Sequence, residues 1–99
     1  MIKTALSNQE VACKLIAVAQ ASIDADEFGT TEWDEGRLDV FHFAKRFGKG
    51  DLKSWAINEL AKSESYSEVF NQEPSDYSQG REAGYRNIID ELCAQEVEA

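Results

Sequence analysis

The sequence predicts an all-α fold, a compact bundle of four to five helices. Apolar residues recur every three to four positions through most of the chain, which is the period of helices that bury one face. Helix breakers are few, because the 99 residues include one proline and six glycines. The length suits one domain, and no linker or internal repeat divides the chain. Residues 1–99 are therefore predicted to form a single helical domain.

The first helix is predicted to begin near Asn8. Ser7 and Glu10 have the spacing of a capping box, which supplies hydrogen-bond partners to the first turn. Leu6 and Val11 stand at the positions of a hydrophobic staple. The predicted inward face consists of Val11, Ala12, Leu15, Ile16, Val18, Ala19 and Ile23. Since alanines occupy much of the remaining surface, this helix is predicted to be the central one of the bundle.

The second helix is predicted over residues 32–47, with Thr31 as its N-cap and Gly48 as its stop. Acidic residues fill its first turn and basic residues its last turn, which suits the helix dipole. Its predicted core residues are Trp33, Val40, Phe41, Phe43, Ala44 and Phe47. Leu38 is predicted to point toward solvent, because helical angles place it well away from Trp33.

Two separate helical segments are predicted between the second helix and Pro74. The first covers about residues 52–62 after an opening Gly-Asp pair, and its predicted core residues are Leu52, Trp55, Ala56 and Leu60. The second is a short turn over about residues 66–71. Ser65 and Glu68 have the spacing of a capping box, and the helix must end before the proline.

The last helix is predicted over about residues 76–96. Its predicted inward residues are Tyr77, Gly84, Tyr85, Ile88, Ile89 and Leu92. Gly80 and Gly84 lie one turn apart on that face, where they would let a neighbouring backbone approach closely. The close packing is expected to offset a cost in helix propensity of about 1 kcal/mol for each glycine.

The chain is strongly acidic. It has 19 Asp and Glu residues against 10 Lys and Arg, a formal net charge of −9, and the carboxylates are spread through the predicted helices. Such a surface repels nucleic acid and anionic membranes and suits a basic partner. The sequence has no apolar run long enough to span a bilayer, and it does not begin with a secretory pattern. A cytoplasmic location is therefore expected.

The carboxylates follow a pattern of their own between residues 24 and 39. This segment holds seven acidic residues and one basic residue, Arg37. On a helix, Glu35 and Asp39 lie one turn apart, with about 5–6 Å between their Cβ atoms. Because this is the scale of successive phosphates along a nucleic-acid strand, such a surface can occupy a groove lined with Lys and Arg. The predicted contact residues are Asp24, Asp26, Glu27, Glu32, Asp34, Glu35 and Asp39, and the carboxylates of the last two helices form a second patch.

Two arginines fall on predicted core faces. Arg37 lies in the stripe that contains Trp33, and Arg81 lies between Tyr77 and Tyr85. An arginine in such a place must pair with a carboxylate, extend its charged end to the edge of the core, or lie on a face left open for a partner. Both arginines are therefore kept as candidate partner-binding residues.

One segment has the spacing of a metal-binding loop. Counted from Asp24, the third, sixth, ninth and twelfth positions match the calcium loop of an EF-hand, with Asp26, Gly29, Glu32 and Glu35. Phe28 stands at the fifth position, where a side-chain oxygen is needed, and Thr31 replaces the usual apolar residue at the eighth. The same residues also suit a turn followed by helix caps. A degenerate calcium-binding helix-loop-helix is therefore an alternative, and no metal ligand or cofactor is assigned.

No motif in the sequence specifies a reaction. His42, the single histidine, is predicted on the solvent face of its helix beside Asp39 and Arg46. Cys13 and Cys93 lie far apart in mostly apolar helical patterns, so they are predicted to be buried free thiols. Neither a Cys/His pair nor a glycine-rich phosphate loop is indicated. No catalytic residue is assigned, and the protein is not expected to be an enzyme.

An acidic, all-helical domain of about a hundred residues without a catalytic motif resembles a known class of proteins. It is similar in kind to the small inhibitors of bacterial defence encoded by phages and mobile elements, especially anti-CRISPR proteins. The resemblance rests on size and charge over the whole chain, and it assigns no role to any single residue. It implies a binding protein that blocks a nucleic-acid-guided complex, such as a CRISPR surveillance complex, in the host cytoplasm.

The sequence therefore predicts a non-enzymatic inhibitor whose acidic surface blocks a basic nucleic-acid-binding protein or complex, by DNA mimicry or by steric occlusion. It is not expected to bind nucleic acid or membranes directly, and a monomer or weak homodimer is expected. A regulatory or adaptor domain for protein interactions is the main alternative.

Overall fold

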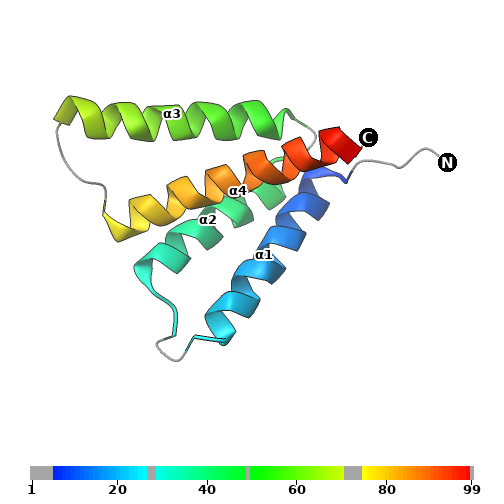
Figure 1. Ribbon diagram of the computed structural model, residues 1–99, viewed down its shortest axis with the longest axis horizontal. Helices are drawn as coiled ribbons and strands as arrows, with labels where there is room; N and C mark the ends of the chain where they lie inside the picture. The colour runs from blue at the N-terminus through cyan, green and yellow to red at the C-terminus, as the bar shows by residue number, and fades with distance from the viewer. Residues whose placement is uncertain (1–5, 27–28, 49, 71–74, 99) are drawn as a thin grey trace.

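The computed structural model describes residues 6–26, 29–48, 50–70 and 75–98, and it places most of them in helices (Figure 1). The all-α prediction is confirmed, because no strand occurs in those four ranges. The side chains of residues 67, 70 and 96–98 are not described. The four helices are α1 (Asn8–Asp24), α2 (Glu32–Arg46), α3 (Leu52–Phe70) and α4 (Asp76–Glu98).

Two predicted helix starts are confirmed in detail. In α1 the amide of Glu10 donates to the Oγ of Ser7 at 3.1 Å, and the amide of Ser7 donates back to the carboxylate of Glu10. In α2 Thr31 and Asp34 form the same reciprocal pair, with distances of 3.2 and 3.0 Å. Each capping box satisfies amides that have no partner within the helix.

Asp51 opens α3, as the Gly-Asp pair suggested. Its carboxylate accepts hydrogen bonds from the amide of Ser54 at 3.0 Å and from the Ser54 hydroxyl at 2.7 Å. These bonds stabilise the charged form, and they lower the pKa of Asp51. Gly48, the predicted stop of α2, has a positive φ of 81°, which glycine adopts without strain.

The predicted break near residues 62–66 is wrong, because α3 continues as one helix. No proline or glycine interrupts this stretch, and contacts with α4 hold it in place. The hydroxyl of Ser63 donates to the largely buried carboxylate of Glu82 at 2.6 Å. One residue later, Glu64 forms an ion pair with Arg86 at 3.2 Å. The capping-box spacing of Ser65 and Glu68 does not start a new helix. The expected last residue of that separate helix, Asn71, lies outside the described residues.

The centre of the bundle is formed by α2 and α4, which run parallel to each other (Figure 1). Trp33 of α2 lies against Gly80 of α4, and Val40 lies against Gly84, so both helices advance in the same direction. α1 packs mainly on α2, and α3 packs on α4. The prediction that α1 is central is therefore wrong.

Glycines explain why α2 and α4 pack so closely. A Cβ added to Gly80 would lie 1.9 Å from the carbonyl oxygen of Trp33, and one added to Gly84 would lie 2.9 Å from the Cβ of Val40. The predicted close approach at both glycines is thus confirmed. Gly36 of α2, which the sequence reading did not single out, plays the same part, because its added Cβ would lie 2.1 Å from the carbonyl oxygen of Tyr77. Only glycine fits at these contacts.

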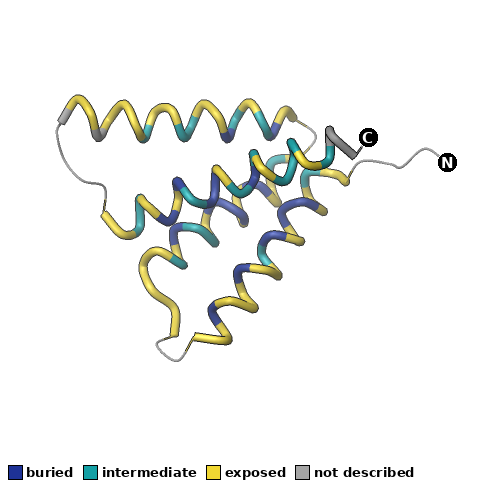
Figure 2. Tube along the Cα trace, viewed as in Figure 1, coloured by how far each residue is buried: buried dark blue, intermediate teal, exposed yellow. Residues whose placement is uncertain are grey.

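The core lies where α1, α2 and α4 meet, and it extends to the first half of α3 (Figure 2). Its buried residues are Val11, Ala12, Leu15, Ala19, Val40, Phe41, Ala44, Leu52, Ala56, Tyr85 and Ile88. Most of the predicted core is confirmed. The molecule measures 49 × 35 × 22 Å. Its shortest dimension is about two helix diameters, so each helix keeps an exposed side.

Four predictions about individual side chains are wrong. Val18 is 54 % exposed, Phe43 is 47 % exposed and Trp33 is 36 % exposed, although all three were expected in the core. Leu38, expected in solvent, is half-buried and packs on the core. The reason for Leu38 is that α2 contacts both α1 and α4, so its buried arc is wider than one packed face.

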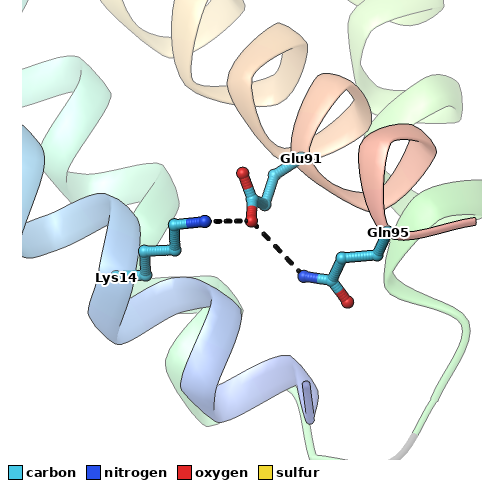
Figure 3. Close-up of polar contacts among 3 residues, drawn as sticks. All are labelled: Lys14, Glu91 and Gln95. Carbon is cyan, nitrogen blue, oxygen red and sulfur yellow. Dashed lines mark hydrogen bonds and ion pairs between the residues drawn. The ribbon is translucent and has the colours of Figure 1, made fainter. Parts of the chain in front are cut away.

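A polar contact fastens α1 to α4 (Figure 3). The ammonium of Lys14 lies 2.6 Å from the Oε1 of Glu91, and Gln95 donates to the same oxygen at 3.5 Å. The hydrogen bond from Lys14 lowers the pKa of Glu91, against an opposing effect of burial. At the other end of α1, the side-chain amide of Asn8 donates to the carbonyls of Gly48 and Gly50, both at 2.8 Å. These bonds hold the α2–α3 connection against the start of α1.

Both cysteines are free thiols. Cys13 is exposed on α1, and Cys93 is half-buried on α4. The expectation of two buried thiols is therefore wrong. Cys13 lies beside the buried row of α1 on the side that faces solvent, because that helix buries a single face against α2.

Candidate functional site

The predicted contact residues lie at the end of α1, in the connection that follows it and in the first half of α2. We call this surface the acidic corner, and its described members are Asp24, Asp26, Glu32, Asp34, Glu35 and Asp39. Glu27 lies outside the described residues. All six are exposed except Asp34, which is half-buried. The connection turns at Gly29, which has a positive φ of 75°.

Internal hydrogen bonds divide five of the six carboxylates of the acidic corner into two groups. Asp34 is occupied by the capping box of α2, and Asp24 accepts a bond from the side chain of Gln20 at 3.1 Å. Asp39 accepts a bond from the hydroxyl of Tyr77. Glu32 and Glu35 form no hydrogen bond or ion pair with any other described residue. These two carboxylates are therefore free to meet a partner.

Arg37 does not neutralise the acidic corner. Its Nε donates to the Oδ1 of Asn87 on α4 at 2.8 Å. Its guanidinium lies over the rings of Trp33 and Phe41, at 5.5 Å from each centroid. Of the three predicted possibilities for this arginine, extension of its charged end to the edge of the core comes nearest, with an amide as the polar partner. Such a half-buried position suits a structural residue more than a contact residue.

Arg81 occupies a different place. It is exposed on α4, its Nη2 donates to the hydroxyl of Tyr85 at 2.9 Å, and its guanidinium lies over the same ring. The structure does not bring Arg81 together with Arg37, and no carboxylate among the described residues forms an ion pair with either arginine. Both arginines are thus held by neutral groups.

Arg81 lines a groove of about 400 Å³ between α2, α3 and α4, which we call the aromatic groove. Its residues are Asp39, Val40, His42, Phe43, Arg46, Trp55, Glu59, Tyr77, Arg81 and Tyr85. Phe43 stacks on Trp55 with 4.9 Å between ring centroids, and Tyr85 meets Trp55 edge-on at 5.4 Å. These rings join the three helices.

The sequence reading missed the aromatic groove, although its parts carry a signal. Tyr77, Arg81 and Tyr85 are spaced four residues apart on α4, and Trp55 and Glu59 have the same spacing on α3. Each set lies on one helical face. What the sequence could not supply is that these faces meet, because that depends on how α3 packs on α4.

His42 is exposed, as predicted, and lines the groove beside Asp39 and Arg46. It makes no hydrogen bond or ion pair with another described residue. Neither cysteine lines the groove. The described part of the chain holds no group of three or more His, Cys, Asp or Glu placed to bind a metal ion. The calcium alternative thus gains no support from the described residues, and Glu27 and Phe28 lie outside them.

Comparison with protein families, curated proteins and solved structures finds no match to this chain. Within the described ranges, no helix has both the length and the apolar run needed to cross a membrane. The acidic corner and the aromatic groove are therefore the two features that bear on function.

Proposed function

We propose that the protein is a non-enzymatic inhibitor that places its acidic corner on a basic, nucleic-acid-binding surface of another protein or complex. The observation that carries the proposal is the exposure of Glu32 and Glu35, which have no internal partner among the described residues. They stand on the first turn of α2, and the end of α1 carries a further exposed carboxylate, Asp24.

Spacing supports mimicry of a phosphate backbone. Glu32 and Glu35 are three residues apart, and Glu35 and Asp39 are four residues apart, so all three lie along neighbouring turns of one helix. Side chains at these spacings have Cβ atoms about 5–6 Å apart. A row of this kind can meet Lys and Arg side chains that otherwise hold successive phosphates.

Net charge supports the same proposal at longer range. A protein with a formal charge of −9 attracts a basic surface and speeds the encounter with it. Small acidic helical proteins of phages and mobile elements, anti-CRISPR proteins above all, are the class that the chain resembles in size and charge. A CRISPR surveillance complex in the host cytoplasm is accordingly our proposed example of a target.

The test is affinity capture from the native host, with the parent chain and a Glu32→Lys/Glu35→Lys variant in parallel. We expect the parent to capture a basic nucleic-acid-binding protein and the variant to lose it. The matched control is Glu68→Lys/Asp90→Lys, which makes the same charge change at exposed carboxylates of α3 and α4. Because these carboxylates belong to the predicted second patch, retention of most of the binding would place the contact at the acidic corner, and loss of binding would place it at the second patch.

Competition then separates mimicry from simple attraction. The captured partner should release its nucleic acid when the parent protein is added, and the binding should weaken from 0.1 M to 1 M salt as the Debye length falls from about 10 to about 3 Å. Equal capture by the parent and the Glu32→Lys/Glu35→Lys variant would contradict the proposal. So would a partner that holds nucleic acid and this protein at the same time.

A further inference from the structure

We propose that the aromatic groove is a second binding site, and that it takes a short peptide segment with a carboxylate beside an apolar side chain. The site lies between α2, α3 and α4, whereas the free glutamates of the acidic corner lie at the start of α2. The inference therefore does not rest on the proposed inhibition of a basic partner.

Two arginines of the groove have no ion pair among the described residues. Asp39 and Glu59 are already occupied, since they accept hydrogen bonds from Tyr77 and Lys62. Arg46 forms no hydrogen bond or ion pair with another described residue, and it is exposed. Arg81 is bonded only to the neutral hydroxyl of Tyr85 among the described residues. The groove thus holds two carboxylates that have donors of their own and two arginines that form no ion pair with a described carboxylate.

Arginine suits a carboxylate in particular. The planar guanidinium offers paired N–H donors that match the two oxygens, and such charge-assisted bonds are about twice as strong as neutral ones. His42 adds a third side chain with a donor at the same edge of the groove. The overall negative charge of the protein limits the number of carboxylates that the ligand can carry.

The aromatic side chains provide the apolar half of the site. Phe43 is 47 % exposed, although one of its faces stacks on Trp55. A large aromatic ring left half in solvent beside a groove gains free energy when an apolar side chain covers it. A ligand with both a carboxylate and an aliphatic or aromatic group therefore pairs with the arginines and covers the ring of Phe43 at the same time.

The shape of the groove favours a peptide over a small molecule. Half of its ten lining residues are exposed, so the groove is partly open to solvent. Small-molecule sites enclose about 70–90 % of the ligand surface. Tyr77 and Tyr85 mark about 12 Å of groove, at 1.5 Å per helical residue. That length accommodates a few residues of a chain whose remainder stays outside.

The experiment selects peptides by display on the full-length protein carrying Trp33→Phe, with counter-selection on the same protein carrying Arg46→Ala as well. Trp33 does not line the groove, so its replacement leaves Trp55 as a fluorescent reporter inside it. We expect enrichment of peptides in which Asp or Glu stands next to Phe, Leu or Trp. The enriched peptide, made synthetically, should shift the Trp55 emission in a saturable way.

Matched variants test the role of each arginine. Arg46→Ala should weaken the binding of the enriched peptide about tenfold or more, and so should Arg81→Ala. Lys45→Ala is the control, because Lys45 is an exposed cation next to Arg46 that does not line the groove. It should bind as the parent does. If Arg81→Ala unfolds because it loses the bond to Tyr85, Arg46→Ala still decides the question.

Several results would overturn the inference. These are failure to enrich any peptide over the counter-selection, enrichment of basic peptides, and unchanged affinity in Arg46→Ala. Tighter binding of ATP or inorganic pyrophosphate than of the selected peptide would also overturn it, because the groove would then be a site for small phosphates. A Glu32→Lys/Glu35→Lys variant that still binds the peptide would show that the two sites are independent.

Discussion

The hydroxyl of Tyr77 on α4 donates a hydrogen bond of 2.5 Å to the Oδ2 of Asp39 on α2. This contact ties the last carboxylate of the acidic corner to the edge of the aromatic groove. Asp39 was expected on the solvent face of its helix, beside His42. Because it has an internal partner, a change at Asp39 alters both the charge and the packing of α2 on α4.

The Tyr77–Asp39 bond predicts a measurable pH effect. Hydrogen bonding to Asp39 favours the neutral phenol and raises the pKa of Tyr77 above its usual value near 10. The contribution to stability is therefore present below about pH 10 and is lost as the pH rises through the folded pKa. Tyr77→Phe should lower the free energy of unfolding at pH 7 by about 1 kcal/mol. Urea unfolding of both proteins at neutral and alkaline pH measures this difference.

The companion variant is Asp39→Asn, which removes the charge that favours the neutral phenol of Tyr77. It should lessen the alkaline dependence of stability as Tyr77→Phe does. A Tyr77→Phe variant with the same alkaline profile as the parent would contradict the assignment.

Gly80→Ala should destabilise the protein even though alanine is the better helix former. The new Cβ would lie 1.9 Å from the carbonyl oxygen of Trp33, which is backbone and cannot rotate away, so α2 and α4 must separate. We expect a loss of about 1–3 kcal/mol in the free energy of unfolding, measured by urea titration. Asp90→Ala on the exposed side of α4 is the control, since it raises helix propensity without touching the contact. An unchanged midpoint for Gly80→Ala would mean that the two helices are not in close contact.

Local signals predicted the helices well, because caps and stops act within a few residues. Ser7 forms the predicted capping box, Thr31 is the N-cap of α2 as predicted, and Gly48 follows the end of that helix. The one failure, at Ser65, has a tertiary cause. Ser63 and Glu64 contact α4, and these contacts keep the chain helical past the capping-box spacing that begins at Ser65. Helix boundaries were thus predictable wherever no tertiary contact competes with the local capping or stop signal.

Inward faces were less predictable, because a helical wheel does not show how many neighbours a helix has. The wheel placed Trp33 and Leu38 on opposite sides of α2, one inward and one outward. In the structure Trp33 stands at the end of the bundle, partly in solvent, while Leu38 packs on the core. The carboxylates of the acidic corner lie close together in the sequence, so their grouping could be predicted. The residues of the aromatic groove come from three helices, so their grouping could not be predicted without the packing of those helices.

Two aromatic residues test the corrected core. Tyr85 is 3 % exposed and contacts Trp55, so Tyr85→Ala should cost about 3–5 kcal/mol. Trp33→Ala should cost clearly less, because 36 % of Trp33 is in solvent. Thermal and urea unfolding of the two variants rank them. A larger loss for Trp33→Ala would show that α2 is rotated relative to the structure.

The two thiols should differ in reactivity. Cys13 is exposed and Cys93 is half-buried, so a water-soluble thiol reagent should modify Cys13 first in the folded protein. Cys13→Ser and Cys93→Ser variants assign the fast and slow phases. In urea both thiols should react at similar rates, which controls for intrinsic reactivity. Faster labelling of Cys93 in the folded protein would contradict the packing of α4.

The ion pair between Lys14 and Glu91 gives the last prediction. The ammonium holds the pKa of Glu91 below its usual value near 4.5, so the folded protein releases this proton more readily than the unfolded chain does. The stabilisation is therefore complete above about pH 4.5, and it disappears as the pH falls through the folded pKa. Since Lys14 is about half exposed, solvent screening limits the effect to about 0.2–1 kcal/mol.

Glu91→Gln keeps the size of the side chain and removes its charge. At pH 7 it should unfold at a lower urea concentration than the parent, and the difference should shrink below pH 4.5 until the two curves meet. High salt should reduce the difference at pH 7 as well, because the pair is partly exposed. Glu68→Gln, at an exposed carboxylate of α3, should show none of this dependence. A constant difference at every pH would mean that Glu91 acts through packing, and that α1 is fastened to α4 without the charge of this pair.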